Sequence, residues 1–312
     1  MNRTLPLQFM LTHGIGDAFI HRFADFVLHN DETMVERVTH IPKELCLAFG
    51  IKQETAQSII DSEIEAELLS RQLAKNGISW VWLAENHYPK QLRKILGKES
   101  PPLIFYRGNL DLCDSRSVGF CGSRAASHKG LAVTEKCCRQ LVEQDIVVVS
   151  GYAKGVDLVS HRTALVEKGK TIIILAEGIT HFREKQEIHG LIHQENCLIL
   201  SQFPPEFPWK GRQAMRRNST IIALSDAMVL VESGQTGGTY AAGEECLRRH
   251  VPLFVIDFAM PPGPSAEANP EFIQRGGIPI RGNLAGIPKL DRLIQTLDTS
   301  SFIGQPQTFA FD

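Results

Sequence analysis

The sequence lacks an excess of charge of either sign. It contains 33 Lys and Arg residues against 35 Asp and Glu residues, so its net charge is −2 at pH 7. A generally basic surface, which would attract nucleic acid over its whole extent, is therefore excluded. Any contact with nucleic acid has to come from a local patch of positive charge.

Long apolar runs are missing as well. No stretch approaches the roughly 18 to 20 residues of a transmembrane helix, and the opening MNRTLPLQFMLTHG lacks the apolar core and cleavage site of a signal peptide. We therefore expect a cytoplasmic protein with no membrane association. The length of 312 residues, with 43% hydrophobic and 22% charged content, is typical of one substantial globular domain plus a smaller one.

Cysteine pairs and complete metal-binding motifs are also absent. The seven cysteines form no CxxC pair, and Cys137 and Cys138 are adjacent in a predicted helix, where disulfide geometry is poor. We interpret the cysteines as reduced, mostly buried thiols. His189 and His193 have the spacing of helical zinc ligands, but no glutamate completes an HExxH motif, so neither a metal nor another cofactor is expected.

The first 88 residues predict a small helical domain. Apolar residues recur at helical spacing in FIHRFADFVLHN and AQSIIDSEIEAELLSRQLAKNG. The turn LTHGIG, at residues 11–16, is similar to that of a helix-hairpin-helix or SAM-like domain. It contains no Lys or Arg, so a plain packing domain is the alternative. Residues 78–83 predict a strand whose tryptophans, Trp80 and Trp82, belong to the core rather than to a base-stacking platform.

From Ser115 onward, apolar runs alternate with helix-length segments. Strands are predicted at 117–121, 146–150, 171–176, 197–201, 226–231 and 252–256. Helices are predicted near 128–143, 154–168, 183–194, 212–224 and 238–249. Continuous apolar runs such as TIIIL and AMVLV indicate strands that are buried on both faces. The predicted fold class is therefore α/β, with a doubly wound, Rossmann-like parallel sheet.

The expected domain organisation follows from these patterns. The helical domain covers residues 1–88, and a linker containing Pro101 and Pro102 covers residues 89–114. The sheet domain covers residues 115–284. Residues 285–312 predict a short helix and a loose tail.

Small and cationic residues follow the predicted strands at one edge of this sheet. In a parallel sheet the turns after the strands share the carboxyl edge, where free amides and helix starts can bind anions. The candidate DNA- or phosphate-binding residues are Gly122, Ser123, Arg124, Ser150, Gly151, Lys154, Gly155, Arg216, Arg217, Asn218, Thr236, Gly237, Gly238 and Thr239. Four such turns together predict a site for a phosphate-rich ligand.

Two further residues near the second turn are interpreted as structural or supporting. Asp157 lies near a helix start, where it can cap the helix or pair with Arg124 or Lys154. His161 lies one helical turn later and is interpreted as a helix-packing residue. No catalytic residue is predicted.

These motifs resemble the DNA-processing protein A family, also called DprA or Smf. The family's GSR turn, its SG-to-H segment, its TI-x-VL strand, its RN-containing helix and its SG-rich turn follow in this order. Here they appear as Gly122-Ser123-Arg124, SGYAKGVDLVSH, TIIIL, RNSTIIALS and QTGGTYAAG. The resemblance implies a homodimer that binds single-stranded DNA and hands it to a RecA-type recombinase during transformation. It also implies that Arg124, Lys154, Arg217 and Asn218 lie in the DNA groove.

Other functions are compatible with parts of the pattern. After Gly282 too little chain remains for the C-terminal winged helix of many members, so a specialised paralogue acting in recombination or phage defence is an alternative. A nucleotide sensor or a Lonely Guy-like phosphoribohydrolase could use the same pocket. That hydrolysis needs carboxylates beside the sugar. Glu244 and Glu245 are adjacent in a predicted helix and point about 100 degrees apart, so at most one faces the pocket. We therefore expect a binding protein and not an enzyme.

Overall fold

The computed structural model describes residues 3–258 and 263–303, which form two compact units. The first unit contains the described residues up to Arg107 together with the segments Gly178–His181 and Leu200–Phe207. The second contains Gly108–Glu177, Phe182–Ile199 and the described residues from Pro208 onward. No helix within these described ranges has the length and apolar character needed to cross a bilayer.

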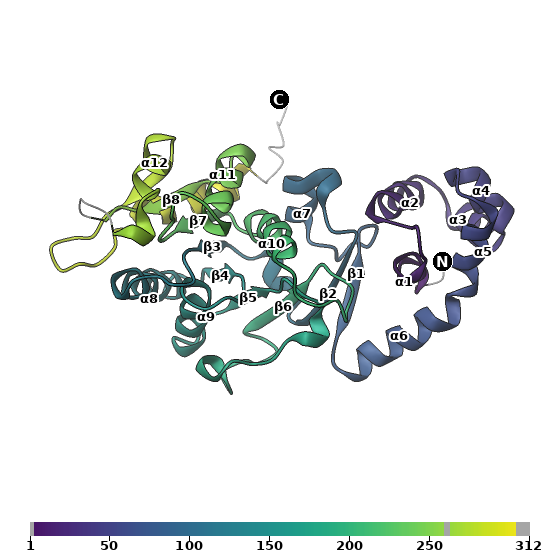
Figure 1. The fold of residues 1–312 in the computed structure, drawn as a ribbon, viewed down its shortest axis with the longest axis horizontal. Helices are drawn as coiled ribbons and strands as arrows, with labels where there is room; N and C mark the ends of the chain where they lie inside the picture. The colour runs from purple at the N-terminus through teal and green to yellow at the C-terminus, as the bar shows by residue number, and fades with distance from the viewer. Residues whose placement is uncertain (1–2, 259–262, 304–312) are drawn as a thin grey trace, which may run out of the picture. The chain divides into compact units, whose positions relative to one another are not determined.

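Helices dominate the first unit (purple to blue in Figure 1). They are α1 (Leu5–Leu11), α2 (Asp17–His29), α3 (Glu32–His40), α4 (Pro42–Phe49), α5 (Gln53–Asp61), α6 (Glu63–Lys75) and α7 (Lys90–Leu96). Strands β1 (Ser79–Trp82) and β2 (Leu103–Gly108) pair antiparallel. Local signals set several helix starts: Asp31 caps α3 by accepting a 2.9 Å hydrogen bond from the Met34 amide.

The core of the first unit is aromatic. The ring of Phe23 lies 4.7 Å from that of Phe9 and 6.0 Å from that of Trp82, measured between centroids. Trp80 and Trp82 are only 8% and 2% exposed. The prediction that both tryptophans belong to the core is therefore confirmed.

The second unit is built on a sheet in which the strand order is β6-β5-β4-β3-β7-β8-β9. The strands are β3 (Ser117–Cys121), β4 (Val147–Ser150), β5 (Thr171–Ile174), β6 (Cys197–Ser201), β7 (Ala227–Leu230), β8 (Leu253–Ile256) and β9 (Ile278–Ile280). The pairs β3–β4, β4–β5, β3–β7, β7–β8 and β8–β9 are parallel. From β3 the chain adds β4, β5 and β6 on one side of the sheet, and from β7 it adds β8 and β9 on the other side. The direction in which strands are added therefore reverses between β3 and β7, and open α/β sheets bind ligands at such a position.

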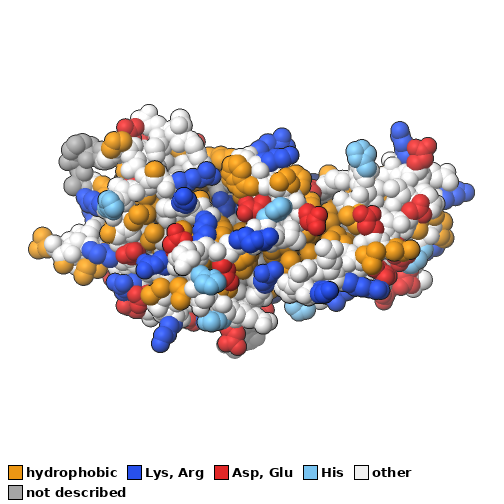
Figure 2. All heavy atoms as spheres, turned by 60° about the horizontal axis from the view of Figure 1, so that its bottom comes forward, with side chains coloured by type: hydrophobic (Ala, Val, Ile, Leu, Met, Phe, Trp, Pro, Cys, Tyr) orange, Lys and Arg blue, Asp and Glu red, His pale blue; other side chains and the backbone are white. Residues whose placement is uncertain are grey.

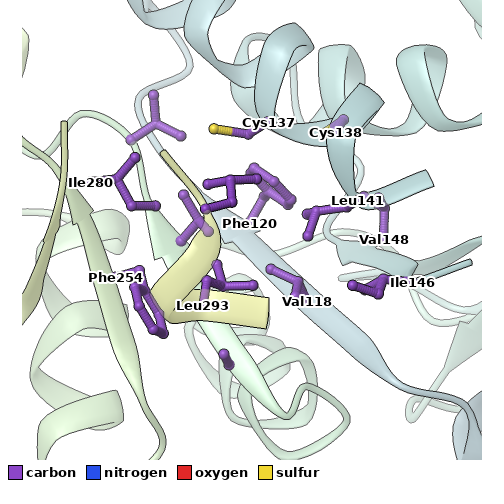
Figure 3. Close-up of a cluster of buried hydrophobic side chains, with 14 of the residues drawn as sticks. Val118, Phe120, Cys137, Cys138, Leu141, Ile146, Val148, Phe254, Ile280 and Leu293 are labelled. Carbon is purple, nitrogen blue, oxygen red and sulfur yellow. The ribbon is translucent and has the colours of Figure 1, made fainter. Parts of the chain in front are cut away.

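Helices cover both faces of this sheet. Helices α8 (His128–Val142) and α9 (Val156–Val166) pack on one face, and α10 (Gly211–Ala223), α11 (Gly238–Arg249) and α12 (Asn269–Gln274) pack on the other (Figure 1). Helix α13 (Asp291–Ile303) brings Leu293 into the core beside Val118 and Phe120 of β3, on the same face as Leu141 of α8 (Figure 3). The buried strands explain the continuous apolar runs of the sequence.

The doubly wound α/β fold predicted from the sequence is confirmed, and the six predicted strands are present with ends shifted by at most two residues. The helix predicted at 183–194 is wrong, because this segment contains only the 3-10 turn Gln186–Ile188. Side chains take backbone groups that a helix would use: the Tyr152 hydroxyl donates to the Arg183 carbonyl at 3.1 Å, and His193 donates its amide to Asn196 Oδ1 at 2.8 Å.

Candidate functional site

A cavity of about 490 Å³ opens where the winding of the second unit's sheet reverses, at the carboxyl ends of β3 and β7. It gathers residues from all four predicted turns. The predicted residues that line it are Gly122, Ser123, Arg124, Asp157, Arg217, Asn218, Thr236, Gly238 and Thr239. A second cavity of about 340 Å³ shares Arg124 and Arg217 with the first and adds Lys154.

Several predicted residues line neither cavity but lie next to residues that do. Ser150 is fully buried and donates its hydroxyl to the Phe120 carbonyl at 2.8 Å. Gly151 lies against the guanidinium of Arg217, which any larger side chain would overlap. Gly155 has φ of +81°, a conformation that favours glycine, and it precedes the first residue of α9. Gly237 precedes α11 in the same way, and Arg216 is exposed on α10.

The start of α8 is already occupied by a carboxylate of the protein itself. Ser127 caps the helix by accepting a 3.0 Å hydrogen bond from the Gly130 amide. Glu232, which is 2% exposed, accepts hydrogen bonds from the Ser127 amide at 2.8 Å and from the Ser127 hydroxyl. Glu232 therefore supplies the negative charge that a helix N-terminus favours.

Glu232 is not among the residues predicted from the sequence, although its side chain lines the larger cavity. A signal was available, because this acidic residue directly follows the apolar run AMVLV at the end of a buried strand. An acid at such a position is buried and has to be paired with donors.

The start of α11 differs from that of α8. It follows Gly237, has no side-chain cap and has no acidic residue in its first turn. The first amides of an α-helix have no partner within the helix and carry partial positive charge. Thr236, Gly238 and Thr239 at this start line the larger cavity. An anion in the cavity can therefore accept hydrogen bonds from α11.

Arg217 is a buried cation beneath both cavities. It is 6% exposed, and its Nη1 donates to the Ile174 carbonyl. Its Nε makes no hydrogen bond within the described part of the chain. Burial lowers the pKa of the guanidinium, while the nearby carboxylates of Asp157 and Glu177 raise it. Arginine stays protonated at neutral pH despite such shifts, so Arg217 brings a buried positive charge to the lining of both cavities.

The other cations lie at the surface. Arg124 and Lys154 are exposed, and the guanidinium of Arg124 lies 5.9 Å from the ring centroid of Trp209. Asn218 donates its side-chain amide to the Gly238 carbonyl at 3.2 Å, which connects α10 to α11. Basic and acidic side chains are interspersed over the face shown in Figure 2. Because the net charge of the chain is −2, the positive charge at the cavities is local.

Asp157 and His161 contact the turn that follows β4. Asp157 accepts a 3.1 Å hydrogen bond from the Ala153 amide. His161 is fully buried, with Nδ1 2.6 Å from the Thr171 hydroxyl and Nε2 2.6 Å from the Gly151 carbonyl oxygen. Burial lowers the pKa of His161 to about 4, so the ring is neutral at pH 7 and Nε2 donates to Gly151. The histidine thus fixes the turn against which Arg217 packs.

Glu244 and Glu245 do not line the larger of these two cavities; together with Tyr240 and Arg275 they line a separate hollow of about 610 Å³. Glu245 pairs with Arg249 at 2.7 Å, and Glu244 pairs with Arg275. The carboxylates that do line the cavity, Asp157 and Glu232, accept hydrogen bonds from backbone amides.

Comparison with known protein sequences identifies several relatives. DNA processing protein DprA from Streptococcus pneumoniae is 32% identical over 181 residues, which cover 56% of this chain and 61% of the relative. The Bacillus subtilis protein of the same name is 26% identical over 184 residues, covering 58% of this chain and 61% of the relative. Protein Smf from Escherichia coli is 24% identical over 258 residues, covering 78% and 65%. The chain therefore spans about three fifths of the length of these relatives.

Solved structures share the fold. DNA processing protein A from Streptococcus pneumoniae has a TM-score of 0.73 at 23% identity, covering 89% of this chain and 94% of that one. The Helicobacter pylori protein, described as having a unique single-stranded DNA binding mode, has a TM-score of 0.58 at 23% identity, covering 72% and 96%. The family model for DNA recombination-mediator protein A matches residues 79–278, which is more than half of the sequence. The chain therefore belongs to the DNA recombination-mediator protein A family.

Proposed function

We propose that the protein binds single-stranded DNA by holding backbone phosphates at the carboxyl edge of the sheet. The observation that carries the proposal is the cavity at the carboxyl ends of β3 and β7, where Arg124 and Arg217 supply positive charge and α11 presents an uncapped start. Both features match an oxyanion with several acceptor oxygens. The Helicobacter pylori relative, which binds single-stranded DNA, supports the choice of ligand.

The exposed cations extend this site toward a longer ligand. Arg124 lines both cavities, and Lys154 lines the smaller one. A phosphate in the larger cavity and a neighbouring phosphate near Lys154 would both meet positive charge. Such contacts to the backbone carry no sequence information, so we expect little dependence on base sequence.

The shape of the site favours a single strand over a duplex. Single-stranded DNA is flexible, so it can bring one phosphate into a cavity while its neighbours follow the surface. Duplex DNA is stiff on this scale and binds best to an extended basic face. On the face shown in Figure 2 the basic and acidic side chains are interspersed, and the net charge of the chain is −2.

We further propose that the protein acts as a homodimer in the cytoplasm and presents DNA to a RecA-type recombinase, in transformation, recombination or phage defence. The description of the family as recombination mediators supports this role. One cavity accommodates only a short piece of DNA, and pairing two protomers would lengthen the binding track and raise avidity. Light scattering at micromolar concentration, with and without an oligonucleotide, tests the dimer. A monomeric mass under both conditions would contradict it.

Filter binding tests the main proposal. Labelled homopolymer single strands and a duplex of equal length are titrated with the protein at several salt concentrations. We expect preferential binding of single strands and a steep loss of affinity with salt, because counterions are released from the phosphates. Equal affinity for both forms, or no binding at low salt, would overturn the proposal.

The proposed function includes no nucleotide turnover. A phosphoribohydrolase needs carboxylates beside the glycosidic bond, whereas Glu244 and Glu245 pair with arginines and line a different hollow from the proposed phosphate site. Incubation with nucleoside monophosphates, followed by chromatography of released bases, tests this statement. Base release that disappears in a Glu244→Ala/Glu245→Ala variant would favour the enzyme instead.

A further inference from the structure

Trp209 is placed unlike the other tryptophans of the chain. Its side chain is 53% exposed, whereas Trp80 and Trp82 are 8% and 2% exposed. The other Trp and Phe side chains that the structure describes are buried or half-buried, so Trp209 is the exposed one among them. A large aromatic ring that stays in water forgoes a substantial hydrophobic stabilisation. Single exposed apolar residues are common, so the surroundings of Trp209 have to decide whether its exposure has a function.

Those surroundings are the cations of the proposed DNA site. Trp209 lines the 340 Å³ cavity together with Arg124, Lys154 and Arg217. The guanidinium of Arg124 lies 5.9 Å from the centroid of its indole ring. A cation at this distance holds the ring by attraction to its π-face. The indole is therefore positioned beside the groups that would hold a phosphate, and the adjoining hollow has a volume within the range of small-molecule sites.

Tyr152 lines the same cavity but is not available for stacking in the same way. Its ring centroid lies 5.2 Å from that of Phe182, and its hydroxyl donates to the Arg183 carbonyl at 3.1 Å and accepts from the Lys185 amide at 2.9 Å. The ring is thus fixed as a wall of the cavity. Trp209 is the aromatic surface in this cavity that remains largely open to a ligand.

We propose that Trp209 is a base-stacking platform, on which a nucleobase rests when Arg124 holds a neighbouring phosphate of the same strand. This inference rests on the proposed binding of single-stranded DNA and adds to it a contact with the bases. Stacking on an aromatic ring accepts any base, because every base has a π-face. It also adds to the discrimination against duplex DNA, in which the bases are already stacked on one another.

Comparison of a normal strand with an abasic strand separates stacking from phosphate binding. Fluorescence anisotropy measures the affinity of the wild-type protein for labelled oligo-dT and for an abasic phosphodiester strand of the same length. Wild type should bind oligo-dT about tenfold more tightly than the abasic strand, which is within the range measured for one stacked base. Trp209→Ala should bind both strands equally, with the affinity that wild type has for the abasic strand. Trp209→Phe should restore most of the preference.

Two controls show whether an effect of Trp209→Ala is specific to this position. Leu47→Ala removes an apolar side chain that is 73% exposed in the first unit, and it should leave both affinities unchanged. Melting temperature checks that each variant is folded. If Trp209→Ala does not fold, quenching of the wild-type indole fluorescence by oligo-dT, and not by the abasic strand, provides the same test, since Trp80 and Trp82 are buried.

The possible failures are distinguishable. If wild type binds both strands equally well, or if Trp209→Ala weakens both to the same degree, stacking is wrong and phosphate binding stands. If neither strand binds at low salt, the proposed function fails and the stacking proposal fails with it. If Trp209→Ala instead changes the oligomeric mass and keeps the preference for oligo-dT, the indole contacts protein rather than bases.

Discussion

Helices α8 and α11 begin at the same edge of the same sheet, yet their starts are chemically opposite. Glu232 and Ser127 close the start of α8, whereas α11 follows a glycine and has neither a capping side chain nor an acidic residue in its first turn. In the sequence alone, the turns before α8 and α11 both look like glycine-containing turns that could bind an anion. The difference shows that such a turn is available to an anion only where the protein's own carboxylates leave it open.

The strongest test of this comparison removes the buried cation beside the open start. In Arg217→Met the cavity loses its buried positive charge, so we expect DNA affinity to fall about 100-fold, or about 3 kcal/mol. Arg216→Met is the matched control, because Arg216 is the neighbouring residue of α10 and is exposed. It should lose less than tenfold. Equal losses in the two variants, measured by anisotropy on folded protein, would mean that burial gives Arg217 no special role.

A second test concerns α9, whose preceding turn His161 holds in place. The unfolded-state pKa is near 6.5 and the folded-state pKa is about 4, so the unfolded chain takes up the proton first on acidification. The stabilisation by neutral His161 is therefore complete above about pH 6.5 and is lost progressively toward pH 4. We expect a loss of up to about 3 kcal/mol in the free energy of unfolding.

Denaturant titrations of wild type and His161→Gln between pH 7.5 and pH 4.5 measure this effect. Both proteins share the titrating carboxylates, so the difference between their pH profiles isolates the histidine. The wild-type curve should fall more steeply below pH 6.5. Parallel curves would show that His161 is not held neutral by burial.

The third test converts the open helix start into a closed one. Thr239→Glu places a carboxylate in the first turn of α11, where it can neutralise the helix start. DNA affinity should fall about tenfold to thirtyfold through repulsion of the phosphate, while the melting temperature stays the same or rises slightly. Gln295→Glu makes the same charge change at an exposed position of α13 and should have little effect. An undiminished affinity in Thr239→Glu would place the phosphate elsewhere.

The sequence was sufficient to predict the parallel sheet and the set of turns that share its carboxyl edge. Strands buried on both faces give continuous apolar runs, such as TIIIL in β5, and the order of elements determines which turns share an edge. Both signals come from whole elements, so an ambiguous residue within one element does not change the predicted fold.

What could not be predicted depends on segments that are distant in sequence. Glu232 reaches Ser127 across 105 positions, and Arg217 reaches the Ile174 carbonyl across 43. The same applies to residues 183–194, where the hydroxyl of Tyr152 donates to the Arg183 carbonyl, an acceptor that a helix would have used. Helix propensity is weak enough for such tertiary contacts to override it.

The smallest expected effect concerns the closed start of α8. In Glu232→Gln the side chain keeps one acceptor oxygen and loses its charge, so the free energy of unfolding should fall by about 1 to 2 kcal/mol. Affinity for DNA should stay the same or rise slightly, because a negative charge leaves the lining of the cavity. Ser127→Ala should destabilise the protein by about 1 kcal/mol through loss of the helix cap. Since Glu232 accepts hydrogen bonds from both the amide and the hydroxyl of Ser127, the double variant should lose less stability than the sum of the two single losses. Strict additivity in chemical denaturation would show that the two residues act independently and that the closure of α8 is not a single structural unit.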